Sequence, residues 1–165
     1  MALTLTQQQT LKAYIEADGT LNAFPLNGDG AFAISQLLNM QASPDYVVYK
    51  NEVMTDDVGE AVNYVAVEAM TTGNQDRIKT FYLMNPVSFN PSRTDIRAFW
   101  DQTFSGALGG QGANTRAALE ALWRRLATRF ETIYAAGSGT TANPSTLGVV
   151  GPVSYPEIEA ARNLP

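Results

Sequence analysis

Few residues in this chain have the types and spacing that protein chemistry usually requires. The 165 residues include no histidine and no cysteine. Without histidine, the chain lacks the usual general base near neutral pH and the commonest metal ligand. Without cysteine, it has neither a thiolate nor a disulfide. A Ser–His–Asp triad and a zinc site of nitrogen and sulfur ligands are therefore excluded within one chain.

Two glycine-rich stretches have the composition of binding loops but not their ligands. Asn27-Gly28-Asp29-Gly30 begins like a calcium loop, yet Ala31 offers no ligand and Leu38 stands where a bidentate Glu is needed. We interpret it as a turn with a helix cap. Residues 137–141 (Gly-Ser-Gly-Thr-Thr) have the composition of a phosphate loop. They follow an expected helix instead of a strand, and no Lys accompanies them.

The adjacent acids Asp56 and Asp57 do not form a facing acid/base pair, because neighbouring residues point to different faces of a helix. They suit a helix N-terminus. We therefore nominate no catalytic residue, no cofactor site and no metal ligand, and we expect a protein that is not an enzyme.

The charge balance argues against a nucleic-acid partner. The formal net charge is −5, whereas proteins that wrap nucleic acid are usually basic. Six of the eleven basic residues nevertheless fall within one stretch: Arg93, Arg97, Arg116, Arg124, Arg125 and Arg129. This stretch is either a solvated helix face or a basic strip toward an acidic protein partner.

No part of the sequence predicts secretion or membrane insertion. The N-terminus has no basic region followed by a long apolar run. No apolar run approaches the roughly 20 residues that span a bilayer. We expect the protein to stay in the reducing compartment where it is made, or to be carried in an assembly.

Apolar spacing predicts helices along most of the chain. The first is expected to begin at Thr6, with Gln9 completing a capping box, and to stop at Gly19. Asp29 is expected to cap a second helix that ends before Ser43-Pro44. Further helical regions are expected at 55–67, at 78–83 with Leu83 in the core, from Asn90-Pro91 to Phe104, and at 115–133 as one continuous apolar stripe.

The fold class expected from this pattern is all-α: a helical bundle of about five or six helices with one short extended segment and a C-terminal arm. The extended segment is 46–49 (Tyr-Val-Val-Tyr), the only strongly strand-like run. Because one short strand cannot make a sheet, we expect it to lie on the core as a link.

The C-terminal segment differs from the rest in composition, and we divide the chain into a core domain, 1–136, and an arm, 137–165. No charged residue occurs from Gly137 to Pro156, although free tails are normally charged. Ser154 and Glu157 have capping-box spacing and predict a short helix. Such a helix needs a docking site, either on its own chain or on a neighbouring subunit. Removal of the arm is expected to leave a folded core that no longer assembles.

Several segments, taken together in their order along the chain, form a recognisable pattern. They are 31–34, 46–50, 90–93, 104–106, 114–119, 127–129, 136–140, 144–148 and 154–164. In this order they resemble a family of small proteins encoded among the structural genes of tailed bacteriophages. The likeness covers nearly the whole chain and is most specific in its C-terminal third. That family often has Trp where Tyr49 stands, and Phe-Glu-Gly near 149–151.

The resemblance implies a non-enzymatic virion protein, assembled in the cytoplasm of the bacterial host. The leading hypothesis is a head–tail connector (adaptor) subunit that forms a homo-oligomeric ring and binds portal and tail or nozzle proteins. The alternatives are a capsid cement or tail accessory protein, and a soluble assembly chaperone. The residues expected at the partner interface are Leu147, Val149, Val150, Tyr155, Ile158, Arg124, Arg125 and Arg129.

Overall fold

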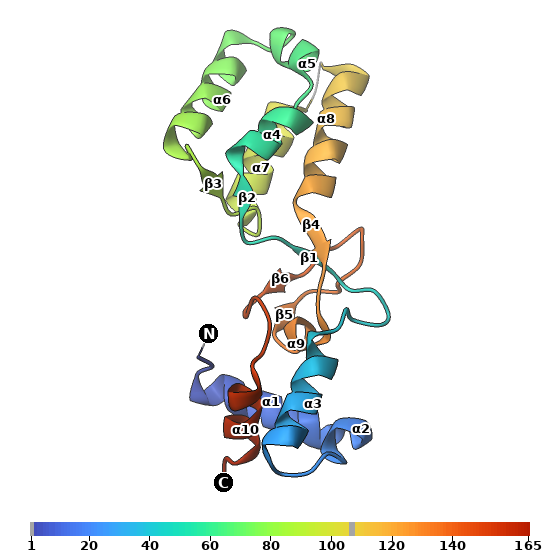
Figure 1. Cartoon of the computed structure of the whole chain (residues 1–165). Coiled ribbons are helices and arrows are strands. Elements are labelled where there is room, and N and C mark those ends of the chain that lie inside the picture. Colours follow the sequence, from blue (N-terminus) through green and yellow to red (C-terminus); the bar gives the residue numbers. More distant parts are fainter. Residues whose placement is uncertain (1, 106–107) are drawn as a thin grey trace. The chain divides into compact units, whose positions relative to one another are not determined.

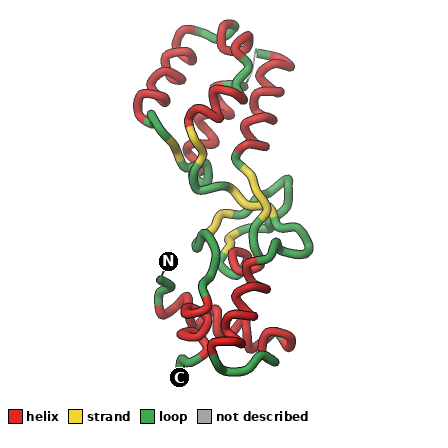
Figure 2. Tube along the Cα trace, viewed as in Figure 1, coloured by secondary structure: helices red, strands yellow, loops and turns green. Residues whose placement is uncertain are grey.

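The structure is a computed structural model that describes residues 2–105 and 108–165. Helices make up 56% of the chain, and Figure 2 shows three small pairs of strands between them. The expectation of a mostly helical protein is confirmed, but the all-α class is corrected. The described residues form ten helices and three two-stranded antiparallel sheets, so backbone groups between helices are paired in short ladders.

The chain divides into two compact units. Unit 1 combines Met1–Val48 with Leu126–Pro165, and unit 2 is Tyr49–Arg125. The chain passes between the units inside strands β1 (Val47–Tyr49) and β4 (Arg124–Leu126), which pair with each other. The boundary expected between residues 136 and 137 falls within unit 1, so the C-terminal segment belongs to the same unit as the N-terminal helices.

Unit 1 contains five helices and one small sheet among its described residues. Strands β5 and β6 pair antiparallel, with Ala135 opposite Leu147. The elements are α1 (Leu5–Ala17), α2 (Gly19–Asn22), α3 (Gly28–Asn39), α9 (Arg129–Thr132), β5 (Ala135–Ala136), β6 (Thr146–Leu147) and α10 (Tyr155–Arg162).

Local caps set the helix starts of unit 1, and some of the predicted cap residues were wrong. Thr4, not Thr6, caps α1 in a capping box with Gln7. Gly19 does not stop α1, because Asp18 ends that helix and caps α2. Asn27, not Asp29, caps α3: its side-chain oxygen accepts the Gly30 N–H at 2.9 Å.

Helix α10 completes the core of unit 1. It contacts both α1 and α3, and Ile158 and Ala161 are fully buried there. As predicted, Glu157 reaches back to the N–H of Ser154. The buried core of unit 1 comprises Leu3, Leu11, Ile15, Leu21, Ala31, Ile34, Leu38, Phe130, Val149, Val153, Ile158 and Ala161.

The segment before and after α10 is also hydrogen-bonded to unit 1. Asn39 bonds both backbone groups of Val153, each at 2.9 Å. Arg162 donates to the carbonyl oxygens of Phe24 and Pro25. In this structure the predicted arm therefore docks on its own chain.

Unit 2 consists of helices α4–α8 and a second small sheet among its described residues. Val53 lies opposite Phe89 in the antiparallel β2–β3 pair. The elements are β2 (Val53–Met54), α4 (Thr55–Ala61), α5 (Tyr64–Glu68), α6 (Thr72–Met84), β3 (Ser88–Phe89), α7 (Thr94–Thr103) and α8 (Gly109–Leu122).

The long helix expected at 115–133 is interrupted. Helix α8 ends at Leu122, and β4 follows. The apolar spacing continues, but the backbone pairs with another segment: the carbonyl oxygen of Trp123 accepts the Lys50 N–H at 2.7 Å. The strand-like run at 46–49 is thus part of a sheet, which corrects its interpretation as an unpaired link.

Aromatic side chains fill the core of unit 2. Phe81 of α6 lies 4.9 Å from Trp100 and 5.1 Å from both Phe89 and Phe99, measured between ring centroids. Trp100 and Trp123 are buried, as expected from their helical spacing. These contacts attach α6 to α7 and to the β2–β3 sheet.

Replacing Ile158 by Ala should lower the free energy of unfolding of unit 1 by about 2–5 kcal/mol, because it leaves a cavity between α1 and α3. Protection of α1 and α3 amides from hydrogen exchange measures this loss. Tyr155→Ala, on the same helix but 49% exposed, should cost less than about 1 kcal/mol. Equal protection in both variants would show that α10 does not dock on its own chain in solution.

Candidate functional site

The five arm residues predicted at a partner interface lie in different environments. Val149 and Ile158 are buried in the core of unit 1, and Leu147 is half-buried in β6. Val150 is 38% exposed and Tyr155 is 49% exposed. Only the last two keep substantial apolar surface for a partner.

The predicted basic strip is used mainly for contacts within the chain. Arg97 donates to the carbonyl oxygens of Pro91 and Ser92, at 2.8 and 2.6 Å. Arg116 donates to the carbonyl oxygen of Phe104 at 3.1 Å. These guanidinium groups bond backbone carbonyls next to helix ends, so the clustering in sequence does not produce a row of free cations.

The three arginines predicted at the interface are partly shielded as well. Arg124 forms an ion pair with Glu120, at 2.6 Å and one helical turn apart. Arg125 and Arg129 are half-buried. Arg124 and Arg125 belong to unit 2 and Arg129 to unit 1.

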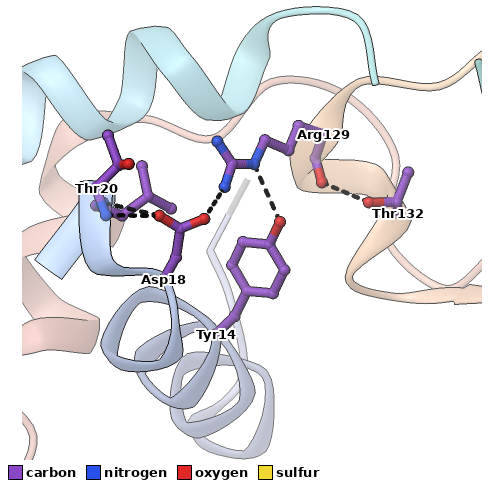
Figure 3. Close-up of polar contacts among 6 residues, drawn as sticks. Tyr14, Asp18, Thr20, Arg129 and Thr132 are labelled. Atoms are coloured by element: carbon purple, nitrogen blue, oxygen red, sulfur yellow. Dashed lines mark hydrogen bonds and ion pairs between the residues drawn. The ribbon is translucent and has the colours of Figure 1, made fainter. Parts of the chain in front are cut away.

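Arg129 lies in the most elaborate polar cluster of unit 1 (Figure 3). Its guanidinium forms an ion pair with Asp18, and its Nε donates to the Tyr14 hydroxyl at 3.0 Å. The side chain of Thr132 donates to the Arg129 carbonyl oxygen at 2.8 Å. The cluster thus joins α9 to the junction between α1 and α2.

Asp18 has two tasks in this cluster. Its Oδ1 accepts the backbone N–H groups of Leu21 and Thr20, at 3.0 and 2.9 Å, and caps α2. These N–H groups, chiefly that of Leu21, together with Arg129 lower the pKa of Asp18, and its partial burial opposes them. The carboxylate is therefore held in its charged form.

A hollow of about 530 Å³ adjoins Arg129. Its walls include Tyr14, Met40, Tyr46 and Thr132. The charge of Arg129 is already balanced by Asp18, and no wall residue forms a nucleophile–base pair. We interpret this cluster as a structural tie of unit 1.

No metal centre emerges from the parts of the chain at 2–105 and 108–165, where no three His, Cys, Asp or Glu residues gather to hold an ion. The calcium-like turn serves as the cap of α3. Asp56 and Asp57 lie exposed in the first turn of α4. Neither the calcium-like turn nor this acidic pair is therefore taken as the candidate functional site.

The candidate site is an apolar groove between α6 and α7 of unit 2. It has a volume of about 510 Å³, and its apolar walls are Phe81, Met84, Ile96 and Phe99. The rim carries two acids and two arginines. The guanidinium of Arg77 lies 5.2 Å from the centre of the Phe99 ring, so cation and aromatic wall form one surface.

Three large aliphatic side chains at or just after the end of α6 are strongly exposed, and one of them, Met84, lines the groove. Leu83 is 81% exposed, Met84 76% and Val87 63%. This corrects the expectation that Leu83 lies in the core. Ile78 and Phe81 are the buried residues of α6, and a period of 3.6 residues from them places Leu83 on the opposite face. That offset was the available sequence signal, and it was missed.

Comparison with known proteins gives no counterpart of this site. No protein-family model, no curated protein and no solved structure matches the chain significantly. A search of the helices in the described parts finds none with the length and apolarity required to cross a bilayer.

The Asp18–Arg129 tie should make the stability of unit 1 depend on pH. Because folding lowers the Asp18 pKa below its ordinary 3.8, the tie stabilises unit 1 above about pH 4 and is lost as pH falls through the lower folded-state pKa. Asp18→Asn keeps a capping oxygen but removes the charge. It should destabilise unit 1 by on the order of 1 kcal/mol at pH 7, with a smaller difference from the wild type at pH 3.

Urea unfolding followed by hydrogen exchange at both pH values tests this. Asp29→Asn is the matched control, because Asp29 is exposed in the first turn of α3. A pH-independent effect of Asp18→Asn would contradict the assigned role of its charge.

Proposed function

We propose that the protein is a non-enzymatic structural subunit of a tailed-bacteriophage particle, a head–tail connector (adaptor) that binds portal and tail or nozzle proteins. The resemblance of the chain to phage structural-gene products supports the assignment to a phage particle. The α6–α7 groove with exposed Leu83, Met84 and Val87 supports a role in binding proteins. This groove is the observation that carries the proposal.

The exposure of these side chains favours a protein partner. Scattered surface hydrophobes are ordinary, but here three large ones fall within five residues, beside an apolar groove. Contiguous apolar surface with a polar rim is typical of protein interfaces. An amphipathic helix or extended segment of a neighbour would bury Met84 and Phe99 together.

The C-terminal segment has a narrower role in this proposal than the sequence predicted. Its buried residues hold unit 1 together, so contacts with neighbouring subunits fall to Val150 and Tyr155. A closed ring needs two different patches on each subunit. The α6–α7 groove is one of them in this proposal.

The copy number in purified particles tests the position in the assembly. A connector ring predicts on the order of ten copies per particle. Quantitative mass spectrometry against the major capsid protein provides the count. Hundreds of copies would instead favour a capsid cement, and absence from the particle would favour a soluble assembly chaperone.

The double substitution Leu83→Asp with Met84→Asp should reduce incorporation into particles at least about tenfold, because it places two charges in a desolvated interface. Leu26→Asp is the matched control, since Leu26 is 76% exposed and lies in unit 1. Circular dichroism checks that both variants stay folded. Normal incorporation of the folded double variant would refute the groove as the binding site.

A further inference from the structure

A second groove lies along another face of α6. Ile78 and Tyr82, one helical turn apart, line it, whereas Phe81 and Met84 line the α6–α7 groove. The second groove has a volume of about 600 Å³ and is lined by residues at or next to α4, α5 and α6 of unit 2. These three helices are labelled in Figure 1. Val62 and Val67 add apolar surface to it. We call it the α4–α6 groove.

Two carboxylates stand on the rim of the α4–α6 groove. Asp56 and Glu60 lie one turn apart on α4, and both line the groove and are exposed. No ion pair involves either residue within the part of the chain that the structure describes. Their charges therefore face solvent without a neutralising partner.

Two tyrosines complete the groove wall. A Cβ atom built on Gly59 would lie 3.9 Å from the hydroxyl oxygens of both Tyr64 and Tyr82, so the two phenols converge over this glycine. Tyr64 is 68% exposed. Burial, and then the nearby Tyr64 and Asp56, raise the pKa of Tyr82. The groove thus offers aromatic rings and neutral hydroxyls beside carboxylates.

The negative charge extends beyond the rim. Residues 51–75 include no Lys or Arg, and their five acids are Glu52, Asp56, Asp57, Glu60 and Glu68. A groove with walls of one charge sign concentrates ligands of the opposite sign. The occupant must therefore combine positive charge with apolar surface.

We infer that the α4–α6 groove binds a basic amphipathic segment of a partner protein. Its apolar side chains pack on Val62, Val67 and Ile78, and a Lys or Arg reaches Asp56 and Glu60. A cation in this position also lies beside the aromatic walls. The inference does not depend on the place of the protein in a phage particle.

A segment of a different protein suits the groove better than a metal ion or a second copy of this chain does. Two carboxylates are too few for a dedicated metal cage, whereas the apolar floor suits side chains. A second copy of the chain is a poor source of the cation, because most of its clustered arginines already have partners. Arg93, Arg97 and Arg124 are examples of arginines that bond within the chain.

The test uses the full chain and a fluorescein-labelled 14-residue amphipathic peptide of Leu and Lys. Fluorescence anisotropy should show binding that weakens with added salt, and no binding of the same peptide with Glu in place of Lys. Asp56→Asn combined with Glu60→Gln should weaken binding on the order of tenfold, equivalent to about 1.4 kcal/mol.

The matched control is Asp57→Asn combined with Glu68→Gln. It changes the net charge by the same amount, with one substitution on α4 and one on the adjacent α5, but does not alter the residues that line the groove. It should weaken binding less than about twofold, because exposed charges at a distance are screened. Equal weakening by both double variants, or no binding by the wild type, would overturn the inference.

Nuclear magnetic resonance of the wild type gives a check that needs no variant. Peptide-induced shifts should map to 55–67 and to Ile78 and Tyr82. Shifts confined to Met84 and Phe99 would assign the peptide to the other groove and overturn the inference. Self-association without peptide, seen by sedimentation, would assign the α4–α6 groove to a second copy if Asp56→Asn with Glu60→Gln abolished it, and would likewise overturn the inference.

Discussion

The packing of α10 against α1 and α3 is the contact on which unit 1 depends. Unit 1 is built from two chain segments separated by all of unit 2, so its core closes only when the second segment returns. An eight-residue helix is marginal alone, and burial of a side chain such as Ile158 contributes about 1.5–3 kcal/mol. The two bonds between Asn39 and Val153 fix the entry of the segment. The segment expected to be an extended arm therefore supplies part of the core of unit 1.

Unit 2 follows a different principle, because its aromatic core is concentrated around one residue of α6. Phe81 contacts four other aromatic rings, and Ile78 is the only other buried residue of that helix. The remaining faces of α6 border two grooves of unlike chemistry. One has mixed charges and exposed aliphatic side chains, and the other has carboxylates and phenols. Two grooves of unlike chemistry on one helix offer separate surfaces to two partners, in line with the proposed role in an assembly.

The clustering of charged residues along the sequence does not match the distribution of charge on the surface of this protein. The arginines after residue 92 form the densest basic stretch, yet most of them bond carbonyls or acids of their own chain. A guanidinium has five donors in a fixed plane, so it readily bonds backbone groups at helix ends. Carboxylates only accept hydrogen bonds, so they cannot bond to those carbonyl oxygens. The acids of 51–75, a stretch that contains no Lys or Arg, accordingly remain a negative surface.

The sequence by itself determined the local features. The bond from Ser154 N–H to Glu157 and the turn at Asn27 depend on residues three positions apart, and the helical majority follows from apolar spacing. Thr4 and Thr6 each have a Gln three residues later, so the spacing of a capping box fits either threonine. The structure uses Thr4, and Leu3 just before it is buried. The tertiary structure alone decided the break after Leu122, the pairing of 46–49 and the docking of α10. Each of these depends on a partner distant in sequence, which spacing along the chain does not encode.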